Sequence, residues 1–312
     1  MKVCFVGLGS IGCRHLRNLS CILKSRGIEL IVHAFRESNK RLDDEIKELV
    51  DSTILRLSDL DDDYDIVFIT NPTYKHYDSL KKFLWKTKNI FIEKPIFDDS
   101  KCNWRELFQV KDINAGIYYV AAPLRYTKVI EQIKRIIKNN EVYSVRSICS
   151  SYLPDWRPNV DYRDVYSAHK EQGGGVSIDC IHELDYLFYL FGFPEHSINL
   201  RGKYSNLEID SEDISVYMFK YKDKIAELHL DYFGKNKERN IEVYTKEGLF
   251  VGDFYRNQII YPNGEIEKFN SDTNDMYINE LSAFLDMIKG KALNENSIEH
   301  SVEVLRFAEG DI

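Results

Sequence analysis

The 312-residue sequence lacks any apolar run of 18 residues, so we expect no transmembrane helix. It also lacks a basic excess, because 42 Lys and Arg against 50 Asp and Glu give a formal net charge of −8. This balance argues against binding to nucleic acid or to an anionic membrane surface. Met1 leads directly into a strand pattern, which predicts no signal peptide and a cytoplasmic protein.

The six cysteines form no C-x-x-C pair and are scattered along the chain. This spacing disfavours a structural zinc site and predicts free thiols in a reducing compartment, and we expect no metal ion. The acidic run from Asp59 to Asp65 is metal-like only in composition, and we expect a solvated helix end and loop there. The sequence contains no internal repeat and no low-complexity segment.

The first 120 residues alternate between strand and helix patterns. Helices are expected up to about Lys24 and over 74–85, between strands predicted at 2–6, 29–35, 65–70, 89–92 and 116–121. Such alternation predicts an α/β fold, with a doubly wound parallel sheet of the Rossmann type. Ligands of such sheets lie at the carboxyl ends of the strands.

The pattern changes after Ala122. Helices are predicted over 124–139, 175–191, 275–288 and 297–307, with a strand over 142–152 and an irregular stretch over 153–172. Short alternating strands fill the region from 197 to 269, which indicates a mainly antiparallel sheet. We therefore predict a Rossmann domain over 1–122 and an α+β domain with an open sheet over 123–312.

A glycine-rich loop follows the first predicted strand and opens the first helix. Gly7, Gly9 and Gly12 form a G-x-G-x-x-G motif that also contains Ser10 and Ile11. The glycines permit a tight turn and a close approach of the backbone to a pyrophosphate, and the helix N-terminus supplies N–H groups and a positive dipole end. The loop predicts a dinucleotide cofactor, NAD(P).

The end of the second strand bears on the choice between the two cofactors. Sites that prefer NAD usually place Asp or Glu there for the ribose diol. Here Arg36 and Ser38 lie at this point and are candidates to hold a 2′-phosphate, so the sequence favours NADP over NAD. The alternative is that Arg36 is an ordinary surface arginine.

Three further motifs follow in order along the chain. Thr70-Asn71-Pro72 with His76 follows the strand at 65–70, and Glu93-Lys94-Pro95 follows the strand at 89–92. Gly173-Gly174-Gly175 precedes a helix that carries His182 and Asp185. With the glycine-rich loop, these motifs resemble the glucose–fructose oxidoreductase / inositol dehydrogenase / MocA (Gfo/Idh/MocA) family over nearly the whole chain.

The resemblance implies NAD(P)-dependent oxidation or reduction of a secondary alcohol, usually on a sugar or cyclitol. In that family the Lys of E-K-P contacts nicotinamide and substrate, which implies this role for Lys94, and the helix His exchanges the proton, which implies it for His182. The resemblance also implies a homo-oligomer, a dimer or tetramer, through the open sheet. The remaining positions that it implies are Asn71, Pro72, His76 and Glu93 for the cofactor and Arg125 for the substrate.

One spacing departs from the family pattern. The usual motif is D-x-x-x-H, whereas Asp179 and His182 give D-x-x-H. Residues three and four apart both lie on one helix face, so Asp179 stays a candidate for the substrate. Glu183 or Asp185 is an alternative partner of His182.

The chemistry suits these side chains. Oxidising a secondary alcohol needs a base for the O–H proton, and His suits this role because its ordinary pKa lies near the working pH. A Lys near the alcohol oxygen stabilises the developing alkoxide, and Pro95 restricts the backbone of Lys94 to extended conformations.

The irregular stretch over 153–172 concentrates aromatic and basic residues. Trp156 and Tyr162 offer faces on which sugar rings or bases stack, and Arg157 can hold a carboxylate or phosphate with two hydrogen bonds. These residues predict an anionic, sugar-like substrate, either a sugar acid or a sugar nucleotide. The alternative is an arm that packs on another subunit, because interfaces favour the same residue types.

Two other classes of protein remain open on this sequence. One is a catalytically inactive NAD(P)-binding sensor or regulator with the same fold, since fold does not determine function. The other is a different Rossmann enzyme, such as a methyltransferase. The presence of both Lys94 and His182 favours an oxidoreductase over the sensor, and Glu93-Lys94-Pro95 with the antiparallel domain disfavours the methyltransferase.

Overall fold

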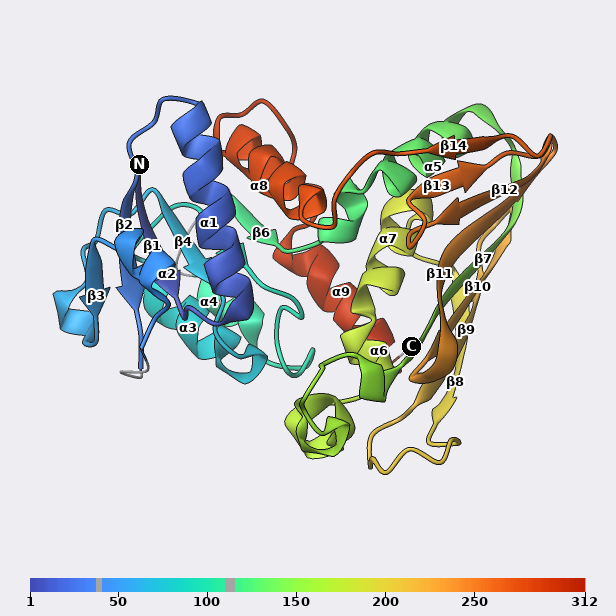
Figure 1. Ribbon diagram of the computed structural model, residues 1–312, viewed down its shortest axis with the longest axis horizontal. Helices are drawn as coiled ribbons and strands as arrows, with labels where there is room; N and C mark the ends of the chain where they lie inside the picture. The colour runs from blue at the N-terminus through green and yellow to red at the C-terminus, as the bar shows by residue number, and fades with distance from the viewer. Residues whose placement is uncertain (38–40, 110–115, 312) are drawn as a thin grey trace. The chain divides into compact units, whose positions relative to one another are not determined.

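The computed structural model describes residues 1–37, 41–109 and 116–311. The chain folds into two compact units (Figure 1): unit 1 contains Met1–Pro123 and Asn274–Glu303, and unit 2 contains Leu124–Thr273 and Val304–Ile312. The chain first passes from unit 1 to unit 2 between Pro123 and Leu124, next to the boundary expected at residue 122. Helix α8 (Asp275–Ile288), which the sequence assigned to the second domain, belongs to unit 1 because its apolar side packs on the parallel sheet.

Unit 1 contains a six-stranded sheet with the order β3-β2-β1-β4-β5-β6, in which every pairing is parallel. The predicted doubly wound parallel sheet is therefore confirmed. Its strands and helices are β1 (Lys2–Val6), α1 (Ser10–Ser25), β2 (Ile31–Phe35), α2 (Asp44–Glu48), β3 (Ser52–Ile54), β4 (Ile66–Ile69), α3 (His76–Phe83), β5 (Ile90–Ile92), α4 (Trp104–Gln109) and β6 (Tyr118–Val120).

A row of aromatic side chains fills one face of this sheet. Phe5 stacks on Phe68 with ring centroids 4.5 Å apart, and Phe91 and Tyr119 continue the row on β5 and β6. Phe284 of α8 packs its ring against Phe68, Phe91 and Tyr119. Helices α1 and α8 therefore cover this face side by side (Figure 1), and apolar burial of these rings supplies much of the stabilising free energy of the unit.

Unit 2 contains an eight-stranded sheet with the order β14-β13-β12-β11-β7-β10-β9-β8. Only β7 and β10 pair in parallel among its described strands. The mainly antiparallel sheet predicted from the alternating pattern is confirmed. Its strands are β7 (Val142–Tyr152), β8 (His196–Gly202), β9 (Ile214–Lys220), β10 (Ile225–Asp231), β11 (Phe233–Thr245), β12 (Gly248–Asp253), β13 (Gln258–Ile260) and β14 (Ile266–Lys268).

Helices cover one face of the unit 2 sheet (Figure 1). They are α5 (Lys128–Asn139), α6 (Val176–Asp179), α7 (Ile181–Phe191) and the C-terminal part of α9 (Ile298–Glu309). Tyr186 of α7 shares a 2.5 Å hydrogen bond with Ser147 of β7, and Phe307 of α9 packs on Phe219 of β9. Alternate residues of each strand therefore point into this core, as the period-2 pattern requires.

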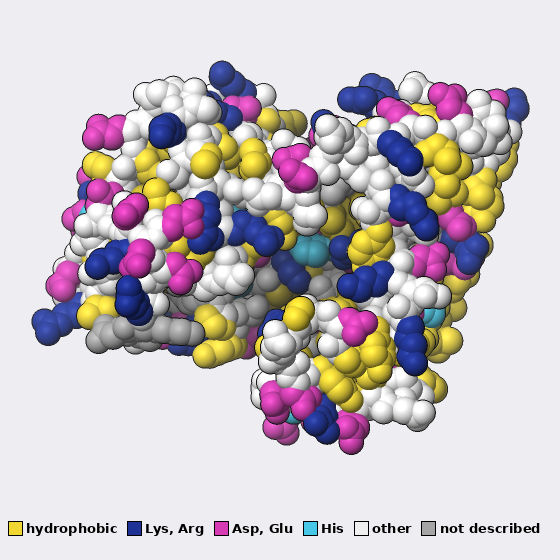
Figure 2. All heavy atoms as spheres, in the orientation of Figure 1, with side chains coloured by type: hydrophobic (Ala, Val, Ile, Leu, Met, Phe, Trp, Pro, Cys, Tyr) yellow, Lys and Arg dark blue, Asp and Glu magenta, His cyan; other side chains and the backbone are white. Residues whose placement is uncertain are grey.

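The opposite face of the same sheet carries exposed apolar side chains. Ile198 of β8 is 63% exposed and pairs across the strands with Met218 of β9, and Leu200 is 71% exposed. Figure 2 shows hydrophobic side chains gathered along the outer side of this sheet. Helices of the described part of unit 2 lie on the other face only, so this face stays open.

Three segments differ in detail from the sequence prediction. The helix expected over 175–191 is interrupted at Cys180, which separates α6 from α7. The irregular stretch contains four short 3-10 helices, at Leu153–Asp155, Tyr162–Asp164, Tyr166–Ala168 and Lys170–Gln172. Strand β3 was not predicted, because its three residues are too few to give a clear strand pattern. Among the described residues, no helix has the length and apolar character needed to span a membrane.

Candidate functional site

The glycine-rich loop lies where the strand order of the unit 1 sheet reverses, between β1 and β4. Gly7 has φ +92°, and a Cβ there would lie 2.9 Å from the Cα of Asn71, so the loops after β1 and β4 touch. Gly12 is equally constrained, because a Cβ would lie 2.6 Å from the Gly7 carbonyl oxygen. The Thr70 hydroxyl donates a 2.6 Å hydrogen bond to that oxygen and fixes the turn.

Gly9 differs from both of these glycines. A Cβ at Gly9 would meet no described atom within 4 Å, and the residue lies at the exposed start of α1. In the described part of α1, no side chain caps this N-terminus and no acidic residue occupies its first turn. The backbone N–H groups beyond Gly9, at Ser10, Ile11 and Gly12, are the groups that a helix N-terminus offers to a pyrophosphate.

The end of β2 carries a charged pair that the sequence analysis did not identify. Lys75, which precedes α3, donates a hydrogen bond to the Glu37 carboxylate. This bond holds the pKa of Glu37 below its usual value. Arg36 lies beside the pair, with its backbone N–H on the Ile54 carbonyl. Ser38, the other candidate for a 2′-phosphate, lies outside the described residues.

His76 is fully buried, with both ring nitrogens on backbone carbonyl groups. Nε2 lies 2.9 Å from the Asn71 oxygen, and Nδ1 lies 3.0 Å from the Pro95 oxygen. Burial lowers the pKa of His76. The ring thus connects the loops after β4 and β5, and we expect it to hold these loops in position beside the cofactor. Pro72 begins the short 3-10 turn that leads into α3.

Glu93 and Lys94 follow β5 at the same carboxyl edge. Glu93 is buried, and one carboxylate oxygen lies 2.5 Å from Nε2 of His15 on α1. The other carboxylate oxygen accepts the backbone N–H of Lys94 at 3.2 Å. Lys94 is half-buried, and the peptide bond between Lys94 and Pro95 is cis. Unit 1 therefore brings together the glycine-rich loop, Asn71 and the E-K-P segment.

The remaining predicted site residues lie in unit 2. His182 is half-buried in the first turn of α7, just after the break at Cys180. Asp179 ends α6, and its two carboxylate oxygens accept hydrogen bonds from the hydroxyls of Tyr166 and Tyr232. Burial and the charge of Asp179 raise the pKa of both tyrosines, so they remain protonated donors.

Glu183 and Asp185, the two alternatives to Asp179, each bind an arginine. Asp185 holds Arg125 with two hydrogen bonds, and both residues are buried. Glu183 accepts a 2.6 Å hydrogen bond from Nε of Arg239 on β11. Arg125 was predicted to contact substrate. Its contacts with Asp185, together with the ring of Tyr189 4.6 Å from its guanidinium carbon, make it a support of α7.

The arm over 153–172 forms a small pocket whose lining includes Trp156, Arg157 and Tyr162. The Trp156 indole N–H donates to the Ser151 hydroxyl at 3.0 Å, and its ring stands edge-on to Tyr232. The guanidinium carbon of Arg157 lies 5.8 Å from the ring centre of Tyr166. The three predicted substrate residues therefore converge, and Tyr166 and Tyr232 connect them to Asp179.

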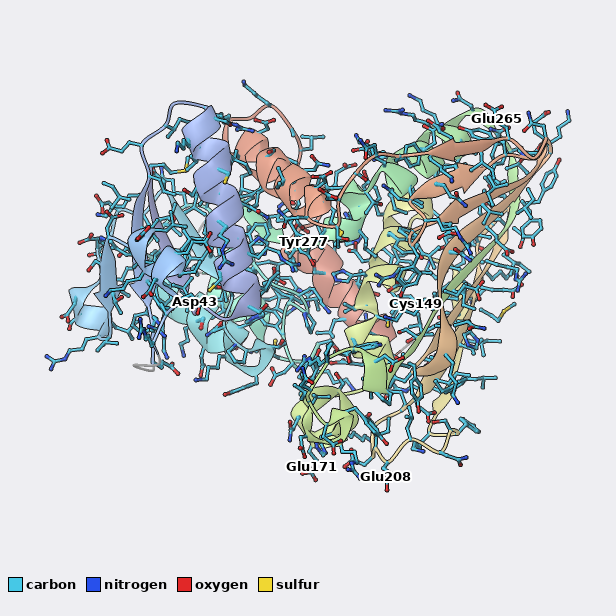
Figure 3. The ribbon with its side chains drawn as sticks, viewed as in Figure 1. Asp43, Cys149, Glu171, Glu208, Glu265 and Tyr277 are labelled. Carbon is cyan, nitrogen blue, oxygen red and sulfur yellow. The ribbon has the colours of Figure 1, made fainter. Side chains whose placement is uncertain are left out.

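Two cysteines that are far apart in sequence meet under α7. The sulfur atoms of Cys149 (labelled in Figure 3) and Cys180 lie 3.8 Å apart. With the Glu183 carboxylate they form a buried group whose atoms lie within 4.8 Å of one another, a spacing that could hold a metal ion. Arg239 pairs with the Glu183 carboxylate, so this carboxylate has a counter-charge without a metal ion, and the hydrogen bond with Cys149 and burial raise the pKa of Cys180. Their 31-residue separation gives no sequence signal.

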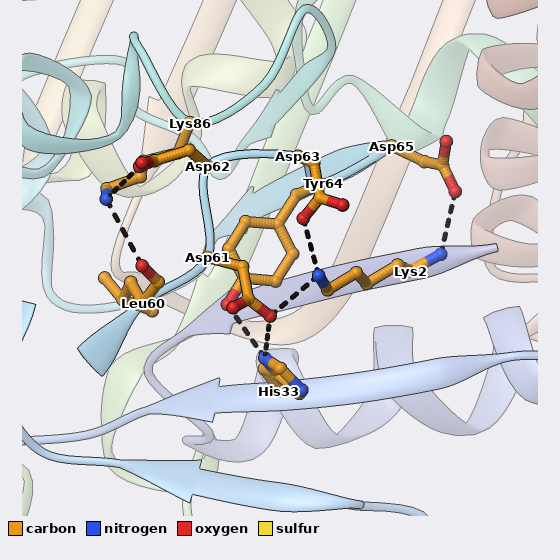
Figure 4. Close-up of polar contacts among 9 residues, drawn as sticks. All are labelled: Lys2, His33, Leu60, Asp61, Asp62, Asp63, Tyr64, Asp65 and Lys86. Carbon is orange, nitrogen blue, oxygen red and sulfur yellow. Dashed lines mark hydrogen bonds and ion pairs between the residues drawn. The ribbon is translucent and has the colours of Figure 1, made fainter.

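The acidic run after β3 is a network of ion pairs (Figure 4). Lys2 contacts the carboxylates of Asp61 at 2.7 Å and Asp63 at 2.5 Å, and Lys86 pairs with Asp62. The amino end of the sheet carries this network, at the edge opposite the glycine-rich loop. The two lysines offset part of the charge of the run, which argues for a structural role.

Comparison with known proteins defines the class of the chain. Residues 1–119 match the oxidoreductase family with an NAD-binding Rossmann fold. Residues 130–251 match the GFO/IDH/MocA C-terminal domain. The chain therefore belongs to the Gfo/Idh/MocA family, and unit 1 contains an NAD-binding Rossmann domain.

Individual relatives are distant. The chain is 26% identical over 204 residues to the uncharacterized oxidoreductase YrbE of Bacillus subtilis (strain 168), covering 63% of this chain and 55% of that protein. It is 26% identical over 162 residues to the 2,7-anhydro-N-acetylneuraminate hydratase of Escherichia coli (strain K12), covering 49% and 41%. The matches thus span about half the length of these relatives or less.

The fold is shared over its full length with solved structures. A levoglucosan dehydrogenase in complex with NADH and levoglucosan superposes with a TM-score of 0.81. The identity is 16%, and the match covers 99% of this chain and 95% of that chain. At this identity the likeness establishes the fold.

Proposed function

We propose that the protein is an NAD(P)-dependent oxidoreductase that converts a secondary alcohol of a sugar-like substrate to the ketone, or the reverse. One observation carries the proposal: the open N-terminus of α1, Asn71 and the Lys94 segment meet at one carboxyl edge of the unit 1 sheet. Ligands of doubly wound sheets bind at this edge, where the strand order reverses.

The residues of unit 1 fit a dinucleotide. The N–H groups of Ser10, Ile11 and Gly12 would hold the pyrophosphate, because Gly9 leaves the approach to them open. Lys94 would face the nicotinamide, and its backbone is fixed by Glu93. When bound, the nicotinamide would supply the hydride acceptor or donor that the protein itself lacks.

Lys94 and His182 are the proposed catalytic residues. The ammonium group of Lys94 would stabilise negative charge on the reacting oxygen and hydrogen-bond the substrate. His182 would accept the hydroxyl proton during oxidation and return it during reduction. Asp179, Glu183 and Asp185 each bind other side chains, so they support the position of His182 by fixing the two helices around it.

We propose that the substrate is anionic, a sugar acid or a sugar nucleotide. Trp156, Arg157 and Tyr162 line the small pocket of the arm, and these are residue types that stack on sugar rings and bind anionic groups. The hydratase relative is named for a neuraminate derivative, which is an acidic sugar. The alternative is that the arm packs on another subunit, and Arg157→Gln separates the two: unchanged KM and kcat would exclude the substrate role.

For the cofactor we propose a preference for NADP, on the basis of Arg36 and Lys75. Arg36 lies at the end of β2, where a 2′-phosphate would be recognised, and Lys75, just before α3, reaches the same point through its hydrogen bond to Glu37. Glu37 opposes this preference, because its carboxylate repels a phosphate, and its pairing with Lys75 reduces that repulsion.

For the assembly we propose a homo-oligomer, a dimer or tetramer, through the open face of the unit 2 sheet. The exposed side chains Ile198, Leu200 and Met218 form an apolar patch on β8 and β9, at one edge of this face. Arg146 lies between Glu227 and Glu242 on the neighbouring strands. An exposed apolar patch of this kind marks a candidate protein–protein interface. The free state of all six cysteines agrees with a reducing, cytoplasmic environment.

The experiment is an absorbance assay at 340 nm with NAD(H) and NADP(H) separately, against sugars, sugar acids and sugar nucleotides. We expect turnover that is lost in Lys94→Ala and His182→Ala, while cofactor binding persists in His182→Ala. Tight cofactor binding without turnover on a broad panel would instead support the sensor or regulator. An absence of binding to either cofactor would refute the proposed site.

A further inference from the structure

His15 is a buried histidine on α1 that none of the sequence motifs includes. Its ring is fully buried. The ring centroid lies 4.9 Å from that of Phe91 and 6.0 Å from that of Tyr277. Tyr277, labelled in Figure 3, lies on α8. Packing from β5 and α8 therefore fixes the orientation of the imidazole.

The fixed imidazole holds the Glu93 carboxylate. Its Nε2 lies 2.5 Å from Oε1 of Glu93, and Oε2 of Glu93 accepts the backbone N–H of Lys94. Nδ1 of His15 has no hydrogen-bond partner among the described residues. Nε2 therefore carries the proton of this hydrogen bond, because a carboxylate oxygen can only accept.

The hydrogen bond also controls the charge of Glu93. Burial alone would raise the pKa of this carboxyl, but the hydrogen bond and charge of His15 outweigh burial and hold the pKa below its usual value. The carboxylate therefore remains ionised at neutral pH, and an ionised carboxylate is the stronger acceptor for the Lys94 N–H.

We infer that His15 is a positioning residue for Lys94, acting through Glu93. This inference rests on the proposed function, in which Lys94 touches the cofactor and the substrate. His15 belongs to the helix whose N-terminus carries the glycine-rich loop, three residues after Gly12. The contacts from His15 on α1 to Glu93, and from Glu93 to the backbone of Lys94, thus fix the position of Lys94 relative to the helix that would hold the pyrophosphate.

Two substitutions of His15 separate positioning from simple packing. His15→Gln keeps an N–H donor at about the distance of Nε2, whereas His15→Asn is one methylene shorter and cannot reach Glu93. A matched control is His33→Asn, because His33 contacts the Tyr64 hydroxyl at 2.8 Å at the other end of the same sheet. Each variant loses one histidine contact in unit 1.

The first readout is steady-state kinetics over pH. For His15→Asn we expect kcat to fall about 10- to 100-fold with little change in KM or in NADH affinity, because small misplacements of a catalytic group cost rate. The acidic limb of the kcat profile should move to higher pH, since Glu93 must be ionised to hold Lys94. In His15→Gln, kcat and the position of the acidic limb should both be close to those of wild type. Adding Glu93→Gln to His15→Asn should remove the shifted acidic limb.

The second readout needs no turnover and keeps the inference testable if the proposed function fails. The protein is labelled with ¹⁵N-lysine and studied without cofactor. The backbone amide resonance of Lys94, assigned by its loss in Lys94→Arg, reports the hydrogen bond to Glu93. Its titration should move to higher pH in His15→Asn and stay near the wild-type position in His15→Gln and His33→Asn. Identical titrations in all four proteins, or equal kinetic effects of His15→Asn and His33→Asn, would overturn the inference.

Discussion

Arg125 and Asp185 form a buried ion pair with two parallel hydrogen bonds, Nε to Oδ2 at 2.7 Å and Nη2 to Oδ1 at 2.6 Å. The pair joins the short 3-10 helix before α5 to α7, the helix that carries His182. Through this pair Asp185 anchors α7 to the 3-10 helix.

Removing one partner of this pair should be costly. Arg125→Met leaves the Asp185 carboxylate buried without a counter-charge, which we expect to lower the free energy of unfolding by about 3–5 kcal/mol. Urea denaturation measures the change. Lys128→Met, which breaks an exposed pair with Glu131 nearby, should cost less than about 1 kcal/mol. Equal costs for the two variants would show that Arg125 and Asp185 are not coupled.

These long-range pairs mark the limit of what the sequence predicts. The glycine-rich loop and the alternation of strands are local patterns, so the parallel sheet followed from the sequence pattern, whereas the role of the E-K-P motif followed from the family resemblance. His15 and Glu93 are 78 residues apart, and Arg125 and Asp185 are 60 apart. No local spacing encodes such pairs, because the fold brings them together only after the sheet and helices have formed.

The break at Cys180 and the assignment of α8 to unit 1 had a similar cause. The apolar pattern over 175–191 is continuous, whereas the break lies next to Asp179, which binds two tyrosines from other segments. Helix α8 is amphipathic in sequence, but its partner sheet precedes it by more than 150 residues, so chain order pointed to the wrong neighbour.

The stability of the protein should depend on His76 below neutral pH. Burial lowers the pKa of His76 below its ordinary 6.5, so as pH falls the unfolded chain takes up this proton first. The free energy of unfolding is therefore highest above pH 6.5 and falls as pH drops from 6.5 to the folded-state pKa. Thermal unfolding between pH 8 and 5 should show a shallower loss in His76→Asn than in wild type. A slope unchanged by the substitution would contradict the burial effect.

The six thiols should differ in reactivity. Cys21 is exposed, whereas Cys149 and Cys180 are buried against each other, and their hydrogen bond and burial raise the pKa of Cys180. Thiolates react far faster than thiols, so iodoacetamide should label Cys21 first. Peptide mass spectrometry over time gives the order. Labelling of Cys149 or Cys180 at the rate of Cys21 in folded protein would mean that this cluster opens readily.

The proposed NADP preference predicts an asymmetric effect at Arg36. Arg36→Gln should weaken binding of NADPH about tenfold more than binding of NADH, because only NADPH carries the 2′-phosphate. Glu37→Gln should act in the opposite direction by removing a repulsive charge. Fluorescence titration of both cofactors into wild type and the two variants measures the six affinities. An equal loss for both cofactors in Arg36→Gln would remove Arg36 from 2′-phosphate recognition.

The most direct test of the account is calorimetric titration of NADH and NADPH into wild-type protein, Gly9→Ala and Gly9→Leu. Both substitutions replace the same helix N-cap, and a Cβ there meets no described atom, so all three proteins should melt at similar temperatures. We expect wild type to bind at least one cofactor and Gly9→Leu to bind it about 100-fold more weakly, because the larger side chain fills the pyrophosphate approach. Gly9→Ala should fall between them. Unchanged affinity in Gly9→Leu, or a wild type that binds neither cofactor, would contradict the assignment of this loop.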